Sequence, residues 1–136
     1  MHCRDHAVQL HRAREEIAAE GELVLIGQAS PRHSAHFRRR LHIELPVLAD
    51  RDRRSYAAAG AKRATLGELV GPRSVMRGVR AGRRSGVVQG RVVGDPAQLG
   101  GAMVVRPDGS VAWSHMSEDA SDNAGVAEIA DALRAA

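Results

Sequence analysis

The stretch that decides the fold is GAMVVRPDGSVAWSHM, residues 101–116. Residues 102–105 form a short apolar run, and residues 111–116 alternate in the manner of a strand. Pro107-Asp108-Gly109 between them marks a tight turn, in which glycine supplies the positive φ that such turns require. The stretch therefore predicts an antiparallel β-hairpin.

A helix is expected after the hairpin. Asp122 and Asn123 are both suitable N-cap residues for it. Its apolar positions follow at i, i+3, i+4 and i+7, as Val126, Ile129, Ala130 and Leu133. This spacing predicts an amphipathic helix that packs against the hairpin.

Upstream of the hairpin, helices and strands alternate. Residues 4–19 have helical periodicity, which ends at Gly21, and the apolar run 23–26 is short enough for a buried strand. Ser30-Pro31 is a hydroxyl cap followed by proline at the first helical position, and it predicts a helix over 31–41.

The alternation continues to residue 60. A second strand is expected over 45–49 and a short helix over 51–59, closed by Gly60. Alternating helices and strands imply parallel strand pairing, to which the hairpin adds an antiparallel pair. We therefore predict a single α/β domain over residues 1–136. Residues 61–98 have the weakest pattern and are interpreted as an insertion or flexible loop, with helical turns at 66–70 and 74–81.

Composition limits the function classes. The chain has 136 residues, 43% of them hydrophobic, and no apolar run approaches the roughly 20 residues of a membrane span. The N-terminus lacks the apolar stretch of a signal peptide, so a cytoplasmic protein is expected.

The charge of the chain raises the question of nucleic acid. The net charge is +4, and every basic residue except Lys62 is arginine. These arginines are spread along the chain, and the few aromatic residues offer little for base stacking. We therefore do not expect nucleic-acid binding.

Several segments resemble AhpC/TSA-type peroxiredoxin-like proteins of the thioredoxin-like superfamily. They are Cys3-Arg4-Asp5-His6, Leu45-Pro46-Val47-Leu48-Ala49-Asp50, Gln98 to Gly101, Val104 to Gly109, and Ser117 to Asn123. The resemblance implies a thioredoxin-like three-layer α/β sandwich with a mixed sheet and a C-terminal hairpin and helix. It implies no cofactor, and we predict no metal site. The expected partners are a peroxide or protein disulfide substrate and a thiol reductant such as thioredoxin or a small thiol.

One part of that pattern is missing from this sequence. In the family a buried strand and a first cysteine precede the helix that begins near Cys3. By the resemblance, the strand would lie between 23–27 and 101–106, and without it those two strands stand roughly 10 Å apart. Either the sheet rearranges, or a partner chain donates a strand, or translation starts upstream of Met1, which is the hypothesis that we prefer. An unpaired sheet edge also favours homo-oligomers.

Cys3 is the single cysteine, so no internal disulfide can form. A helix N-terminus favours the thiolate, and Arg4 and His6 could add positive potential. By the resemblance, Cys3 takes the position of the second, resolving cysteine, and Leu99, Gly100 and Gly101 form the loop that faces it. The glycines could equally serve only to start the strand tightly. Trp113 and His115 are interpreted as packing and edge residues.

Two functions remain open from the sequence. The first is a peroxiredoxin-like, thiol-dependent antioxidant oxidoreductase, impaired if the chain is truncated. The second is a redox-inactive thioredoxin-like module with a binding or regulatory role. A Cys3→Ser variant separates them, since only the first activity requires the thiol.

Overall fold

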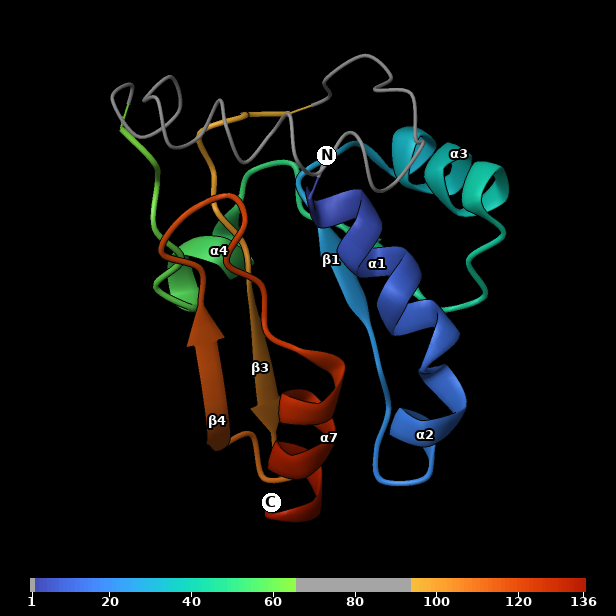
Figure 1. The fold of residues 1–136 in the computed structure, drawn as a ribbon. Coiled ribbons are helices and arrows are strands. Elements are labelled where there is room, and N and C mark those ends of the chain that lie inside the picture. The colour runs from blue at the N-terminus through green and yellow to red at the C-terminus, as the bar shows by residue number, and fades with distance from the viewer. Residues whose placement is uncertain (1, 66–93) are drawn as a thin grey trace.

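The computed structural model describes residues 2–65 and 94–136, with side chains from residue 4 onward (Figure 1). The helical turns expected at 66–70 and 74–81 lie outside these ranges. Within them the order of elements follows the predicted one, helix, strand, helix, strand, helix, hairpin and helix. No helix in the described part of the chain is long and apolar enough to cross a membrane.

The first predicted helix is present but divided. Helix α1 spans His2–Arg12 and helix α2 spans Arg14–Ala18, with the break at Ala13. Ala13 still links the two, because its N–H donates to Gln9 O and its carbonyl oxygen accepts from Ile17 N–H, both at 3.1 Å. The apolar periodicity therefore continues through the break, and Ile17 of α2 is fully buried.

The first two strands pair in parallel, as predicted, but are shorter than expected. Strand β1 (Leu25–Gly27) lies beside β2 (Val47–Ala49), with Ile26 opposite Leu48. Leu25 N–H donates to Pro46 O at 2.9 Å, and Asp50 N–H donates to Gly27 O at 2.8 Å. Both strands end at the same edge, as parallel pairing requires.

The two helices that follow these strands begin with different caps. Helix α3 spans Pro31–Leu41 as predicted, and Ser30 caps it by accepting a hydrogen bond from His33 N–H. Helix α4 is short, Arg54–Ala58, because Asp50 forms a turn first and its carboxylate then accepts from the amides of Arg54 and Ser55. Hydrogen bonding by Ser55 is the main reason that the pKa of Asp50 lies below its usual value.

The hairpin is confirmed. Strand β3 (Gly101–Val105) pairs antiparallel with β4 (Val111–Met116), and Gly109 in the turn has a φ of +85°. The register shifts at Val104/Val105, which marks a bulge beside the turn.

The predicted cap of the last helix is wrong. Helix α7 spans Val126–Arg134, with Gly125 at the N-cap, so neither Asp122 nor Asn123 caps it. The Asp122 carboxylate instead accepts from Glu118 N–H at 2.7 Å and contacts His115. The carboxylate of Glu128 helps to cap the start of α7 by accepting a hydrogen bond from Gly125 N–H at 3.3 Å.

The expected mixed sheet is divided into two two-stranded sheets, β1-β2 and β3-β4. In the described ranges no strand lies between β1 and β3 to join them, so each keeps one edge without a strand partner. Both sheets contact the same core, since Leu25 of β1 and Ala102 of β3 pack against it.

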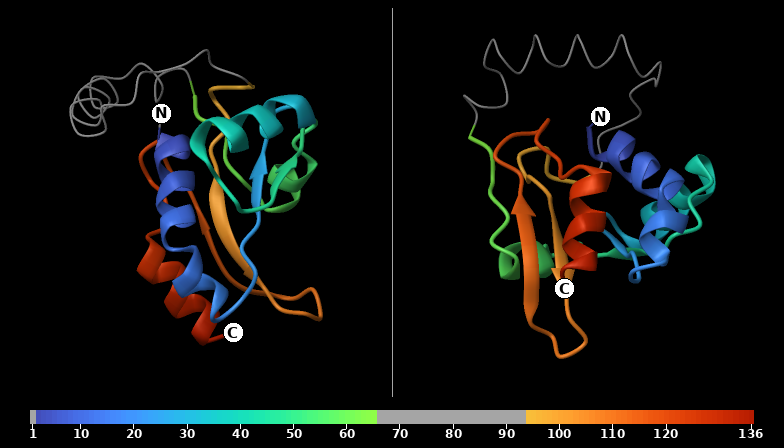
Figure 2. Two further views of the ribbon diagram at one scale, coloured as in Figure 1. Left: turned by 90° about the vertical axis from the view of Figure 1, so that its right-hand side faces the viewer. Right: turned by 60° about the horizontal axis from the view of Figure 1, so that its bottom comes forward.

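The core lies between the strands and the helices on one of their faces. Helices α1, α2 and α7 cover that face, and α4 lies on the other side (Figure 2). The central buried side chains come from α1, α2, α7 and the loop before α7, namely Leu10, Ile17, Ala124 and Ile129. Trp113 packs against them from β4, which confirms its predicted role.

Candidate functional site

The segments that the sequence singled out meet at one end of the molecule. In Figure 1 the N-terminus of α1, the carboxyl end of β1 and the start of β3 all lie at the upper end. The order and direction of the elements cause this, since β1 runs toward this end and β3 starts from it. In α/β folds the carboxyl ends of parallel strands are the usual place for ligands and catalysis.

Cys3 and Arg4 lie at the beginning of α1. The helix begins at His2, so Cys3 is in its first turn, and Arg4 is half-buried. The first turn of an α-helix has free N–H groups and the positive end of the helix dipole, which stabilise a thiolate.

His6 lies one turn after Cys3 on the same helix and is half-buried. Its Nε2 is 2.9 Å from the carbonyl oxygen of Ala124, just before α7. Burial lowers the pKa of His6 against the opposing effect of that hydrogen bond, and the nearby His115 lowers it further. The ring is therefore neutral at pH 7. When Nε2–H donates to Ala124 O, Nδ1 carries the lone pair. The lowered pKa thus reduces the positive charge that His6 carries at neutral pH.

His115 contacts two carboxylates that were not predicted as its partners. Its Nε2 lies 3.0 Å from Asp122 Oδ1, and its Nδ1 lies 3.6 Å from Glu128 Oε1. The imidazole also stacks on Trp113, with the ring centroids 6.3 Å apart. His115 is thus a packing residue, as predicted, but also part of a polar cluster next to His6. No periodic pattern in the sequence indicates these contacts, because Asp122 is brought back to His115 by the loop after β4.

The loop Leu99 to Gly101 is fixed by β4 and by residue 62. Leu99 is buried and its N–H donates to Lys62 O at 3.0 Å, while Gly100 O accepts from Ser117 N–H at 3.1 Å. A Cβ on Gly101 would lie 2.6 Å from His115 O. The close approach that Gly101 permits is therefore to β4, which favours the interpretation that it serves to start the strand.

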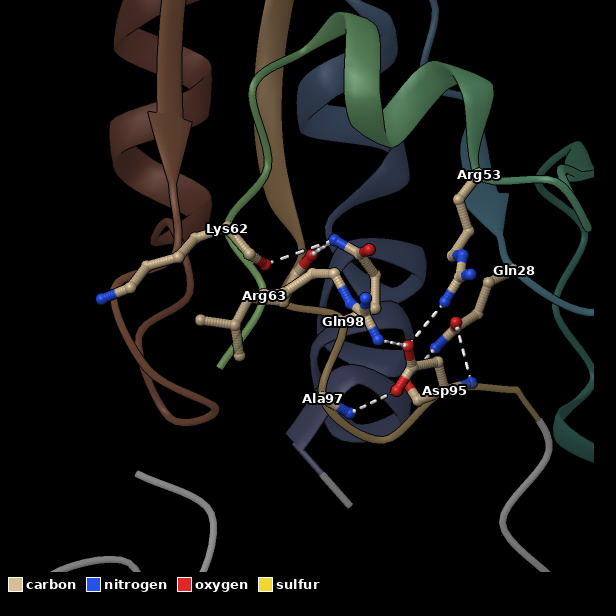
Figure 3. A network of polar contacts seen from close by, with 8 residues as sticks. Gln28, Arg53, Lys62, Arg63, Asp95, Ala97 and Gln98 are labelled. Atoms are coloured by element: carbon tan, nitrogen blue, oxygen red, sulfur yellow. Dashed lines mark hydrogen bonds and ion pairs between the residues drawn. The ribbon is translucent and has the colours of Figure 1, made fainter. Parts of the chain in front are cut away.

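A second cluster of polar residues was not predicted from the sequence (Figure 3). Asp95 Oδ2 lies 2.6 Å from both Arg53 and Arg63, and Asp95 Oδ1 accepts from Ala97 N–H at 2.9 Å. The hydrogen bond from Ala97 is the first cause, and Arg63 a further one, that the pKa of Asp95 lies below its usual value. Asp95 follows the segment with the weakest sequence pattern, and no local pattern connects it with residues 32 and 42 positions away.

The part of the chain with described side chains contains no group of three or more His, Cys, Asp or Glu residues placed to hold a metal ion. His115, Asp122 and Glu128 form a cluster of polar contacts instead.

The chain matches the model of a known protein family. The family model for the AhpC/TSA antioxidant enzyme matches residues 9–119, a range that begins after Cys3, Arg4 and His6. No curated protein and no solved structure matches the chain. The matched range includes both parallel strands and the hairpin, and the order of elements is that expected of a thioredoxin-like fold. The chain belongs to the AhpC/TSA antioxidant enzyme family, and its mixed α/β fold is thioredoxin-like.

Proposed function

We propose that this protein is a thiol-dependent antioxidant oxidoreductase that reduces a peroxide or a protein disulfide through Cys3. The observation that carries the proposal is the place of Cys3 in the first turn of α1, in a chain of the AhpC/TSA family. An 11-residue helix is long enough for its dipole to favour the thiolate over the thiol.

The chemistry needs one thiol in this chain and an external thiol reductant. The Cys3 thiolate attacks a peroxide oxygen, the O–O bond breaks, and the leaving oxygen takes a proton, which yields sulfenic acid and water or an alcohol. An external thiol then condenses with the sulfenic acid, releasing water and forming a mixed disulfide. A second thiol displaces Cys3 and leaves as the oxidised disulfide. A protein disulfide substrate would enter at the mixed-disulfide stage.

Two neighbours of Cys3 have assigned roles in this proposal. Arg4 supplies positive potential beside the thiolate. His6, neutral at pH 7, offers the Nδ1 lone pair as an acceptor for the thiol proton, because Nε2–H is directed at Ala124 O. We assign to the loop Leu99 to Gly101 the substrate-facing position.

The test compares the wild type with Cys3→Ser in peroxide consumption with excess small-molecule thiol. In the wild type, a reagent specific for sulfenic acids should label Cys3 after peroxide is added. The wild type should also consume peroxide about tenfold faster than an unactivated thiol does. The matched control is Cys3→Ser/Ser114→Cys, which moves the only thiol to an exposed position on β4. If this variant is as active as the wild type, the position of Cys3 confers no activation and the proposal fails.

A second candidate is a redox-inactive binding module. Each two-stranded sheet has edges without a partner strand in the described ranges. The strands of these sheets also carry exposed apolar side chains, namely Ile26 at 46%, Leu48 at 55% and Met103 at 37% exposure, and these favour a binding role. Association through these residues should survive Cys3→Ser and weaken in Ile26→Thr. Light scattering on both variants would distinguish this function from the thiol chemistry.

A further inference from the structure

A cavity of about 470 Å³ opens where β1 and β2 end, on the side of the thioredoxin-like fold where α3 begins. Its polar lining comes from three separate parts of the chain, namely Gln28, Ser30, His33, Arg51, Arg53 and Asp95. None of the described residues that line it has a role in the proposed thiol chemistry, so a ligand in this cavity is a separate proposal.

The walls of the cavity are held in place by specific contacts. Gln28 Nε2 donates to Asp95 O at 2.8 Å, and Asp95 N–H donates back to Gln28 Oε1 at 3.0 Å. Gly94 has a φ of +94°, and a Cβ on it would lie 2.8 Å from the Gln28 side chain. The backbone at 94–95 can therefore lie against Gln28 only because residue 94 is glycine.

The lining of the cavity carries more positive than negative charge. Asp95 is the single acidic residue of the lining, and its Oδ2 is already 2.6 Å from both Arg53 and Arg63. Within the lining itself, Arg51 and Arg53 against Asp95 leave an excess of one positive charge. Arg51 has no ion-pair or hydrogen-bond partner among the described residues.

The fold also holds Arg53 in an unusual backbone conformation. Its φ of +58° and ψ of +32° are left-handed, which costs a residue with a Cβ about 1–2 kcal/mol. In this conformation Arg53 ends the turn that follows β2 and its guanidinium reaches Asp95 in the lining. Only one of its terminal nitrogens contacts Asp95, so other donors remain for a ligand.

A hydroxyl and an imidazole, from Ser30 and His33, complete the polar lining at the start of α3. Ser30 Oγ lies 2.8 Å from His33 Nδ1, which fixes the ring at the start of α3. Guanidinium groups beside the positive end of a helix are the combination that recognises phosphate oxygens. The volume exceeds that of a single phosphate ion and leaves space for a small organic group.

From this juxtaposition of Arg51, Arg53, Ser30 and His33 around one open cavity, we propose that the protein binds the phosphate group of a small phosphomonoester. Arg51 provides a cation that has no ion-pair partner in the part of the chain that the structure describes, and Arg53 is positioned by its ion pair with Asp95. The site lies at the carboxyl ends of the parallel strands, where α/β folds commonly bind ligands.

The experiment titrates the full chain with inorganic phosphate at constant ionic strength and follows backbone amide resonances by NMR. We expect saturable shifts confined to residues of the lining, Gly94 and Asp95 among them. Arg51→Gln should weaken the binding of phosphate about fivefold or more, because it removes about one charge-assisted hydrogen bond. Arg51 is exposed and makes no hydrogen bond or ion pair with another described residue, so this variant should remain folded.

The matched control is Arg40→Gln, which removes the same charge from an exposed position in the last turn of α3. It should bind phosphate as the wild type does. Equal weakening in both variants would show a general charge effect and overturn the proposal, as would the absence of saturable binding. Acetate at the same ionic strength should not saturate the site, and binding equal to that of phosphate would overturn the assignment of a phosphate ligand.

Discussion

The side-chain amide of Gln28 and the backbone of Asp95 form two hydrogen bonds, of 2.8 and 3.0 Å, across 67 positions of sequence. Gln28 comes directly after β1, and Asp95 lies in the segment that leads into β3. The pair therefore connects the parallel half of the fold to the hairpin half, which share no strand hydrogen bonds in the described part of the chain.

Gln28→Ala should destabilise the protein by about 1–2 kcal/mol, because it removes both hydrogen bonds and leaves two half-buried backbone groups of Asp95 unsatisfied. Urea denaturation would measure the change in the free energy of unfolding. Gln9→Ala is the control, since Gln9 is exposed on α1 and removal of its side chain should change the stability by less than about 0.5 kcal/mol. Equal effects of the two substitutions would show that the Gln28–Asp95 pair contributes nothing.

Gly94→Ala should destabilise more than Gly60→Ala, although both glycines have a positive φ. At Gly60, with a φ of +73° and no atom within 4 Å of a new Cβ, alanine incurs only the backbone strain, about 1–2 kcal/mol. At Gly94 alanine incurs the same backbone strain, and its Cβ would in addition lie only 2.8 Å from the side chain of Gln28.

The clash can be separated from the strain by a double-mutant cycle with Gln28→Ala. In the Gln28→Ala background the cost of Gly94→Ala should fall to that of Gly60→Ala, as measured by urea denaturation. If the cost is the same in both backgrounds, the contact with Gln28 does not explain the requirement for glycine.

The elements with a local signal were predictable from the sequence. The Ser30-Pro31 start of α3 and the Pro107-Asp108-Gly109 turn depend on residues a few positions apart, and both are confirmed. The residue at which α7 starts could not be predicted from the sequence, because Asp122 has several possible hydrogen-bond partners. Its carboxylate contacts His115 and the amide of Glu118, and only the folded chain shows which partners it uses.

Some residues of the candidate site could be predicted from the sequence, and others could not. Cys3 could be singled out as the single cysteine near the start of a predicted helix, and His6 as a neighbour on that helix. The structure places both in α1. The clusters around His115 and Asp95 depend on contacts between residues 7 to 42 positions apart. The pairing of Asp95 with Arg53 and Arg63 has no periodic signature, since loops bring these residues together.

Ile17→Ala should destabilise the protein by about 2–5 kcal/mol, because Ile17 is fully buried in the central core cluster and its removal leaves a cavity. Ile17→Val should cost about 0.5–1.5 kcal/mol. Val111→Ala is the control, since Val111 is 51% exposed on β4. If Val111→Ala destabilises as much as Ile17→Ala in urea denaturation, α2 does not contribute to the core as described.

His6 should make the protein less stable as the pH falls below about 6.5, the pKa of an unperturbed imidazole. Burial lowers the pKa of His6 in the folded protein, so the unfolded chain takes up the proton first. Stability from the neutral ring is complete above the unfolded pKa and is lost as the pH falls through the folded pKa. The pKa values of Asp50, Asp95 and Asp108 also lie below the ordinary range, so these carboxylates titrate outside the window from pH 7.5 to 5.5.

His6→Gln tests this effect, since glutamine keeps a donor for Ala124 O but does not titrate. Urea denaturation at pH 7.5 and 5.5, at one ionic strength, should show a smaller loss of stability for His6→Gln than for the wild type. His36→Gln is the control, because His36 is exposed on α3 and its removal should leave the loss unchanged. If the wild type and His6→Gln lose the same stability, the contact of His6 with Ala124 does not depend on the neutral ring, and its assignment as acceptor for the Cys3 proton must be abandoned.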